Sequence, residues 1–302
     1  MSARPERPID GVRAMLLSLL GGPDASIAHR RAQAAVFAAG QPPPPPGLRV
    51  AAGALAGRPV ETLEREPGGG PNVFLHLHGG GYVMGDPAGS RGLTTALALA
   101  TAARVVSLDY RLAPDHPFPA AVEDAVAAYR ALLADGAEPA RIAIGGESAG
   151  GGLAIAALIA IRDAGLPAPA AAVALSPWVD LACTGGSYET RAGADPLLTR
   201  RILLEMADQY LQGQDPAAPL ASPLAADLSG LPRLLVQAGS DEVLLDDAVT
   251  LAQRAEAAGV SVELEVWPDM IHVWQMFGGA LPEADEAVAR IAAFLARAWP
   301  PP

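Results

Sequence analysis

The chain has 302 residues and is 51% hydrophobic, so it can bury one large core or a main domain with a smaller partner. Its formal net charge of -12 argues against nucleic acid or an anionic membrane as a partner. All of its basic residues are arginines, which excludes a Walker phosphate loop and a Schiff-base lysine, and the single Cys183 excludes an internal disulfide framework and a thiolate metal cluster.

The first part of the chain has two helical patterns, at residues 12–20 and 26–39, followed by the proline-rich stretch 41–47. Five consecutive prolines form a stiff extended spacer rather than a packed element. We therefore expect residues 1–46 to form an N-terminal helical segment attached to the main body, where it either packs simply or forms part of a cap.

The N-terminus also bears on location. Residues 1–10 lack the apolar core of a signal peptide, and no run in the sequence approaches membrane-spanning length. We therefore expect a soluble, cytoplasmic protein with no membrane partner. The sequence does not determine the oligomeric state, so a homodimer remains an open alternative to a monomer.

From residue 47 onward the sequence predicts mainly strands and helices in alternation. Segments 48–54 and 59–66 are expected to pair as a hairpin at a sheet edge. The further expected strands are 73–77, 104–108, 142–145, 170–175, 233–238 and 262–267, and the expected helices are 90–102, one ending at 133, 153–161, 245–258 and 283–298. This alternation predicts a doubly wound, mostly parallel α/β sheet with helices on both faces.

Residues 181–230 interrupt the alternation. The stretch is punctuated by glycine and proline, has no strand period, and contains one helix-like run at 197–211. An insertion of this size between strands of an α/β sheet is usually a lid over the site. We therefore expect an α/β core made of residues 47–180 and 231–302, with 181–230 as a helical cap insertion.

The stretch from Gly146 to Gly150 has the pattern G-x-S-x-G, between an apolar strand and an Ala/Leu/Ile-rich helix. A strand that reverses into a helix within so few residues forces the central residue into a strained backbone conformation, and the flanking glycines prevent collisions there. Ser148 is then left at the tip of the turn, above the N-terminus of the following helix. This arrangement is typical of a nucleophile elbow.

Three consecutive glycines, Gly79 to Gly81, follow the expected strand 73–77 and His78. Glycines at a strand end let the backbone approach a bound atom and point amides at it, whereas the alternative interpretation is a flexible turn. Neither this stretch nor the elbow matches G-x-G-x-x-G, so we do not expect dinucleotide binding.

Hydrolysis of an ester needs a nucleophile, a base, a group that orients the base, and donors for the oxyanion. With Ser148 as the nucleophile, His272 is the best base, because it is the only histidine after Ser148 and lies just past the last strand. Asp241 follows strand 233–238 and is the expected orienting carboxylate. All three fall at C-terminal ends of strands, and their order Ser, Asp, His is that of the α/β-hydrolases.

Three other carboxylates compete with Asp241 for the role beside His272. Asp246 and Asp247 lie at the start of the next helix, where capping that helix is the simpler interpretation. Asp269 is the third alternative. We assign the role to Asp241, because it directly follows a strand and a Gly-Ser turn.

On these residues the chain resembles the bacterial hormone-sensitive-lipase family of carboxylesterases, also called family IV. The resemblance covers residues 75–275 and rests on His78-Gly-Gly-Gly81, Tyr82-Val-Met-Gly-Asp86, Asp109-Tyr-Arg-Leu-Ala-Pro-Asp-His-Pro-Phe-Pro119, Gly146-Glu-Ser-Ala-Gly150, Ser176-Pro-Trp-Val-Asp180, and the loops of Asp241 and His272. It implies the α/β-hydrolase fold, with a cap built from the N-terminal helices and the stretch after Trp178. It also implies an oxyanion hole from the amides of Gly80, Gly81 and Ala149, while His78 braces the glycine loop.

The sequence departs from the family pattern at two places. Glu147 stands in the elbow where Asp or Thr is commoner, which we expect to alter the hydrogen bonding behind the elbow without removing the nucleophile. The acid loop reads Asp241-Glu-Val-Leu244, where the family usually has Asp-Pro-Leu.

The combined expectation is a serine carboxylesterase that hydrolyses short- to medium-chain esters through an acyl-enzyme, with no cofactor and no metal. The acidic chain lacks an obvious amphipathic docking helix and is only 5% aromatic, which argues against a long lipid tunnel. Two alternatives remain. A lactone hydrolase would use the same triad, because a lactone is a cyclic ester, whereas a non-catalytic ligand-binding protein on this fold is disfavoured by the presence of His272.

Overall fold

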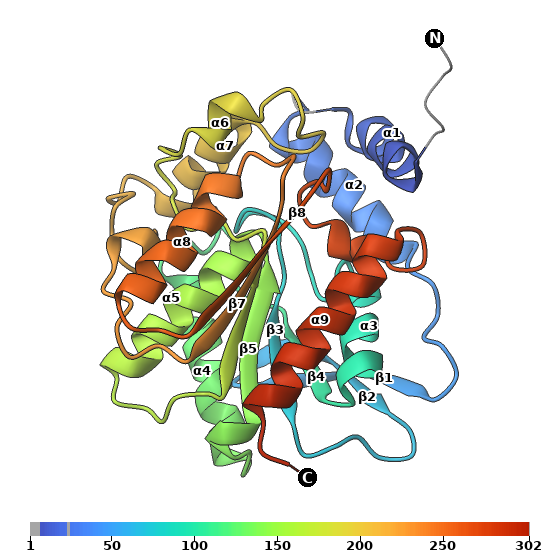
Figure 1. The fold of residues 1–302 in the computed structure, drawn as a ribbon, viewed down its shortest axis with the longest axis vertical. Coiled ribbons are helices and arrows are strands. Elements are labelled where there is room, and N and C mark those ends of the chain that lie inside the picture. The colour runs from blue at the N-terminus through green and yellow to red at the C-terminus, as the bar shows by residue number, and fades with distance from the viewer. Residues whose placement is uncertain (1–6, 23–24, 302) are drawn as a thin grey trace.

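The computed structural model describes residues 7–22 and 25–301, which form a sheet flanked by helices with further helices above one end (Figure 1). The strands are β1 (Leu48–Leu55), β2 (Arg58–Arg65), β3 (Val73–Leu77), β4 (Arg104–Leu108), β5 (Ile142–Glu147), β6 (Ala171–Leu175), β7 (Arg233–Gly239) and β8 (Val262–Trp267). They make one eight-stranded sheet in the order β1-β2-β4-β3-β5-β6-β7-β8. Strand β2 pairs antiparallel with β1 and β4, and every other pair is parallel, so the predicted mostly parallel sheet is confirmed.

Helices cover both faces of the sheet. Helices α3 (Arg91–Thr101) and α9 (Pro282–Ala298) pack together on one face, while α4 (Ala120–Ala134), α5 (Ala149–Asp163) and α8 (Leu245–Ala257) lie on the other (Figure 1). Each face buries its own apolar cluster. Helix α5 is apolar all round and almost wholly buried, which is why it can occupy the centre of its layer.

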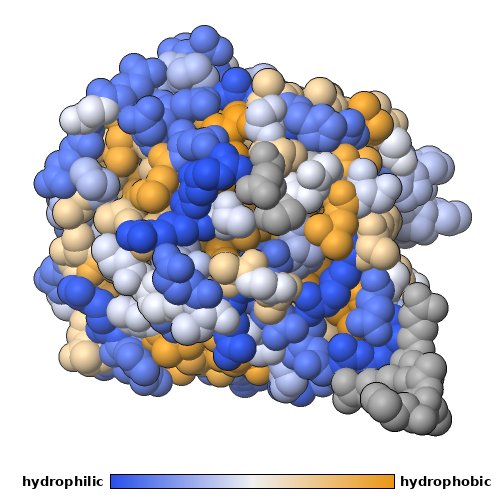
Figure 2. Space-filling model, turned by 90° about the horizontal axis from the view of Figure 1, so that it is seen from above, coloured by the Kyte–Doolittle hydropathy of each residue, from blue (hydrophilic) through white to orange (hydrophobic). Residues whose placement is uncertain are grey.

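Four helices lie above the C-terminal end of the parallel strands, at the top of Figure 1. They are α1 (Pro8–Leu20), α2 (Ile27–Ala39), α6 (Ser187–Thr190) and α7 (Arg200–Leu211). Arg31 fastens α2 to the core, because its guanidinium donates to the carbonyl oxygens of Val83 and Ala113. Seen from this end, apolar side chains gather in patches between hydrophilic ones (Figure 2). Exposed apolar side chains at this end include Met15, Leu17, Val36 and Leu204.

Most expected elements are found within a few residues of their predicted bounds. Helix α7 begins at Arg200 rather than 197, because the Thr199 side chain accepts the amide of Ile202 and caps the helix there. Helix α5 begins at Ala149 rather than 153, since the turn at Ser148 leads straight into it. The short helix α6 and the 3₁₀ turn η3 (Trp274–Phe277) were not expected. No helix among the described residues is long and apolar enough to span a membrane.

Candidate active site

Ser148 occupies the turn between β5 and α5 with φ +58° and ψ -123°, a conformation that side-chain-bearing residues rarely adopt. A Cβ at either Gly146 or Gly150 would collide with the carbonyl oxygen of Leu77 on the neighbouring strand. The two flanking glycines are therefore required by the close approach of β3. The strained residue of this turn is therefore Ser148 itself, as expected for a nucleophile elbow.

His272 lies in the loop after β8 and joins Ser148 to a carboxylate. Its Nε2 lies 3.0 Å from Ser148 Oγ, and its Nδ1 lies 3.1 Å from Oε2 of Glu242. Glu242 is fully buried, His272 is 4% exposed and Ser148 is 9% exposed. Burial raises the pKa of Glu242, and the hydrogen bond from His272 opposes that rise. The structure thus forms a hydrogen-bonded chain of serine, histidine and glutamate.

The expected contact between Asp241 and His272 is contradicted by the structure. Asp241 Oδ2 instead accepts a hydrogen bond of 2.7 Å from Arg13 of α1, and its side chain is 25% exposed. The chain turns directly after β7, and in this turn Glu242 points inward to His272 while Asp241 points outward to Arg13. The carboxylate that contacts His272 therefore belongs to the residue after the one that the sequence indicated.

The other three carboxylates also lie away from His272. Asp246 accepts the amide of Ser187, and Asp247 accepts the amides of Val179 and Asp180, so both hold the segment after β6 rather than cap α8. Asp269 pairs with Arg7 of the N-terminal segment. None of them competes with Glu242.

The glycine loop lies beside Ser148 and lines the same pocket. Gly80 and Gly81 have φ values of +116° and +63°, which favour glycine. Within the described part of the chain, the amides of Gly80, Gly81 and Ala149 donate no hydrogen bond, so they are available to a bound oxygen. His78 stacks on Tyr110, and its Nδ1 lies 2.8 Å from the carbonyl oxygen of Gly79. These contacts match the bracing role expected for His78.

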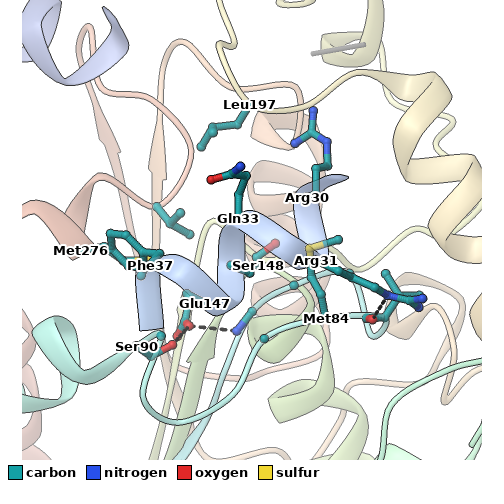
Figure 3. A pocket seen from close by; sticks show the side chains of 18 of the residues that line it. Arg30, Arg31, Gln33, Phe37, Met84, Ser90, Glu147, Ser148, Leu197 and Met276 are labelled. Atoms are coloured by element: carbon teal, nitrogen blue, oxygen red, sulfur yellow. Dashed lines mark hydrogen bonds between the residues drawn. The ribbon is translucent and has the colours of Figure 1, made fainter. Parts of the chain in front are cut away.

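Glu147, next to the nucleophile, ties the glycine loop to the elbow. Its Oε1 accepts the amide of Gly79 at 2.8 Å and the hydroxyl of Ser90 at 2.7 Å (Figure 3). Its Oε2 lies 2.7 Å from Nε2 of the buried His76. Burial raises the pKa of Glu147, but His76, Ser90 and the Gly79 amide outweigh it, and the net pKa is lowered. Glu147, which is longer than the Asp or Thr commoner at this position, thus makes hydrogen bonds with three groups: the Gly79 amide, the Ser90 hydroxyl and the His76 ring.

A pocket of about 480 Å³ opens above Ser148 and His272. Figure 3 shows Gln33 and Phe37 of α2, Met84 and Leu197 arranged around Ser148. The apolar side chains of its lining belong to Leu16, Leu19, Ala34, Ala35, Phe37, Val83, Met84, Leu112, Leu197, Leu198, Leu203, Met206, Val273, Met276 and Phe277. The volume lies at the lower end of the range typical of small-molecule sites. Among the described residues, no cluster of three or more potential metal-binding side chains occurs.

The sequence contained one signal that pointed to Glu242. In the family pattern Asp-Pro-Leu the acid lies two residues before the leucine, and here Glu242 lies two residues before Leu244. Matching the loop on its leucine, rather than on its aspartate, selects Glu242. The partner of Asp241 could not be found in this way, because Arg13 is more than two hundred residues away in the chain.

Comparison with known proteins agrees with this fold. A family of the α/β hydrolase fold matches residues 74–276. An acetyl-hydrolase from Streptomyces hygroscopicus is 50% identical over 269 residues, covering 89% of this chain and 88% of the relative. An esterase from Acinetobacter venetianus is 37% identical over 241 residues, covering 80% and 79%. A crystal structure of an esterase from the bacterial hormone-sensitive lipase family superposes with a TM-score of 0.93, at 47% identity and 99% coverage of both chains.

The chain therefore belongs to the α/β-hydrolase fold family. Within that fold it is a carboxylic ester hydrolase of the bacterial hormone-sensitive-lipase type, which confirms the resemblance drawn from its motifs. The alternative of a non-catalytic binding protein is set aside.

Proposed function

We propose that the protein is a serine carboxylesterase that works through an acyl-enzyme, with Ser148 as nucleophile, His272 as general base and Glu242 as the residue that orients His272. The observation that carries this proposal is the chain of hydrogen bonds from Ser148 through His272 to Glu242 at the base of the pocket. Glu242 takes the role that the sequence assigned to Asp241.

The reaction follows from the positions of these groups. As Ser148 Oγ attacks the ester carbonyl carbon, its proton passes to His272 Nε2, and the carbonyl oxygen becomes an oxyanion. The amides of Gly80, Gly81 and Ala149 supply donors for that oxyanion. Collapse of the tetrahedral intermediate breaks the carbon–oxygen bond to the alcohol, which leaves with the proton from His272. Water, activated by His272, then hydrolyses the acyl-serine and releases the acid.

The substrate follows from the pocket. We propose that the N-terminal segment 1–46 and residues 181–230 form a cap over the α/β core, because α2 and α7 line the pocket above Ser148. Residues 1–6, 23 and 24 of that segment lie outside the described residues. The moderate volume and apolar walls of the pocket suit the acyl chain of a small ester rather than a long lipid. The 50% identical relative is an acetyl-hydrolase, which supports a short acyl group.

The experiment that tests this function is a hydrolysis screen of p-nitrophenyl esters with two to sixteen acyl carbons, together with lactone rings. We expect kcat/KM to peak between acetate and hexanoate. A maximum at twelve carbons or beyond, or interfacial activation on emulsions, would indicate a lipase instead. Faster opening of lactone rings than of all linear esters would indicate a lactone hydrolase.

Chain-length preference should depend on the predicted cap. Leu203 in α7 lines the pocket and is 1% exposed, so Leu203→Ala should enlarge the acyl site. We expect preference to shift by about tenfold towards longer chains, with kcat on acetate changed by no more than about threefold. Leu204→Ala is the matched control, because Leu204 is its neighbour on the same helix but is 40% exposed and lies outside the pocket. Equal shifts in the two variants would contradict the role of α7.

A metal should not be required, because serine, histidine and backbone amides supply every step proposed above. We expect dialysis against EDTA to leave kcat/KM for p-nitrophenyl butyrate unchanged. A loss of activity that added divalent cations restore would overturn that expectation.

A further inference from the structure

Asp195 is a buried carboxylate in the predicted cap insertion, outside the triad. It lies in the loop before α7 and is 3% exposed. Its Oδ1 accepts the amides of Leu197 and Leu198 at 2.8 and 2.9 Å, and its Oδ2 accepts the amide of Val243 at 3.0 Å. A carboxylate that accepts three backbone amides is strongly held in place.

The two oxygens of Asp195 connect two different parts of the site. Leu197 and Leu198, held by Oδ1, are part of the pocket wall. Val243, held by Oδ2, directly follows Glu242, the acid that contacts His272. Asp195 therefore fixes the backbone of the acid loop and the apolar wall of the pocket at once.

A second contact fastens the same loop from outside. The guanidinium of Arg13 donates both to Asp241 Oδ2 and to the carbonyl oxygen of Ala194, the residue before Asp195. Asp241 and Val243, the two neighbours of Glu242, are thus held by Arg13 of α1 and by Asp195, neither of which belongs to β7 or α8. The β7–α8 connection alone does not supply these restraints.

Asp195 also lies within electrostatic reach of the triad. Burial raises the pKa of Asp195, and His272 together with the three amides opposes that rise. The titratable groups that interact with it electrostatically are His272, Glu242 and Arg30 of α2. The hydrogen bonds of Asp195 nevertheless go to backbone amides of the cap segment and the acid loop, so its influence on His272 is exerted through that loop.

We propose that Asp195 is a positioning residue for the catalytic acid: through the Val243 amide it fixes Glu242, and through Glu242 it fixes His272. The segment 181–230 then positions the catalytic acid in addition to lining the pocket. This inference rests on the proposed function, because it assumes that Glu242 orients His272 for catalysis.

Two substitutions separate the two ends of Asp195. Asp195→Asn removes the charge and places an amide donor against one of the three backbone donors. Asp195→Ser keeps a hydroxyl that can accept an amide of its own turn, but it is too short to reach Val243. We expect both to lower kcat on p-nitrophenyl acetate by about 10- to 100-fold, with KM within about threefold. Should the asparagine variant fail to fold, kcat is measured on the serine variant, which preserves the turn.

Thr199→Ala is the matched control for a loosened cap. Thr199 lies four residues after Asp195 and caps α7 by accepting the amide of Ile202. No hydrogen bond joins Thr199 to the acid loop. Its loss should destabilise the same segment while leaving kcat on acetate within about threefold. A kcat for Asp195→Ser equal to that of Thr199→Ala would reduce Asp195 to a structural role and overturn the proposal.

A double-mutant cycle with Glu242→Gln gives the decisive readout. If Asp195 acts through Glu242, then Asp195→Asn should cost less than about threefold in kcat once Glu242 has been replaced. Equal losses in both backgrounds would mean that Asp195 acts independently of the acid and would refute the inference. A failure of the proposed function looks different, because the wild-type protein would then hydrolyse no ester or carry no inhibitor on Ser148.

Discussion

Replacement of Ser148 by alanine is expected to lower kcat on p-nitrophenyl esters by roughly three to six orders of magnitude while the fold is retained. The hydroxyl lies 3.0 Å from His272 Nε2, and the variant loses the atom that would form the acyl-enzyme. Alanine has the same Cβ as serine, so the strained turn at φ +58° gains no new collision. Circular dichroism and a thermal melt should therefore resemble those of the wild type.

Mass spectrometry after treatment with a phosphonate or sulfonyl fluoride should place a single adduct on Ser148. Ser229→Ala, which alters an exposed turn away from the pocket, is the control and should leave both labelling and turnover unchanged. An adduct on Ser176 or Ser240 would identify a different nucleophile. Retention of more than about one tenth of the wild-type kcat in Ser148→Ala would exclude the acyl-enzyme route through this residue.

The sequence was most informative where local rules act. Strands β3, β4 and β8 have their predicted bounds, because each is a short run bounded by loop residues. The sequence alone predicts that Ser148 and His272 lie close together, since the C-terminal ends of parallel strands meet at one edge of a sheet. The turn at Ser148 follows from its two glycines, which only a tight strand-to-helix reversal requires.

Contacts between distant segments could not be predicted in the same way. The choice between Asp241 and Glu242 depends on which side of the loop each side chain leaves, and the Arg13 contact that holds Asp241 outward comes from the N-terminal helix. Asp195 gave no signal beyond an Asp-Pro pair in an irregular stretch, because its contact with Val243 joins segments 48 residues apart. Such pairings depend on how the helices above the sheet pack, which no local pattern specifies.

Replacement of Glu242 by glutamine is expected to lower kcat by about 10³ to 10⁴, whereas Asp241→Asn should lower it by less than tenfold. Glutamine at 242 can turn its NH2 towards His272 Nδ1, which then becomes an acceptor and leaves the proton on Nε2. In that tautomer Nε2 cannot remove the proton from Ser148. Asp241→Asn leaves the 3.1 Å contact between Glu242 and His272 intact. It weakens the hydrogen bond from Ser240 and the partly exposed pair with Arg13, a pair that contributes at most about 1 kcal/mol to stability.

The comparison should be made on kcat with p-nitrophenyl acetate, alongside the melting temperature of each variant. The Asp241 substitution serves as the control for Glu242, because the two side chains are adjacent and both changes replace a carboxylate by its amide. We expect Glu242→Gln to keep a melting temperature close to that of the wild type, since glutamine has the shape of glutamate. Asp241→Asn should lower the melting temperature slightly and change kcat little. If the asparagine variant proves the less active of the two, Asp241 must approach His272 during turnover, and the static contact with Glu242 would not define the catalytic acid.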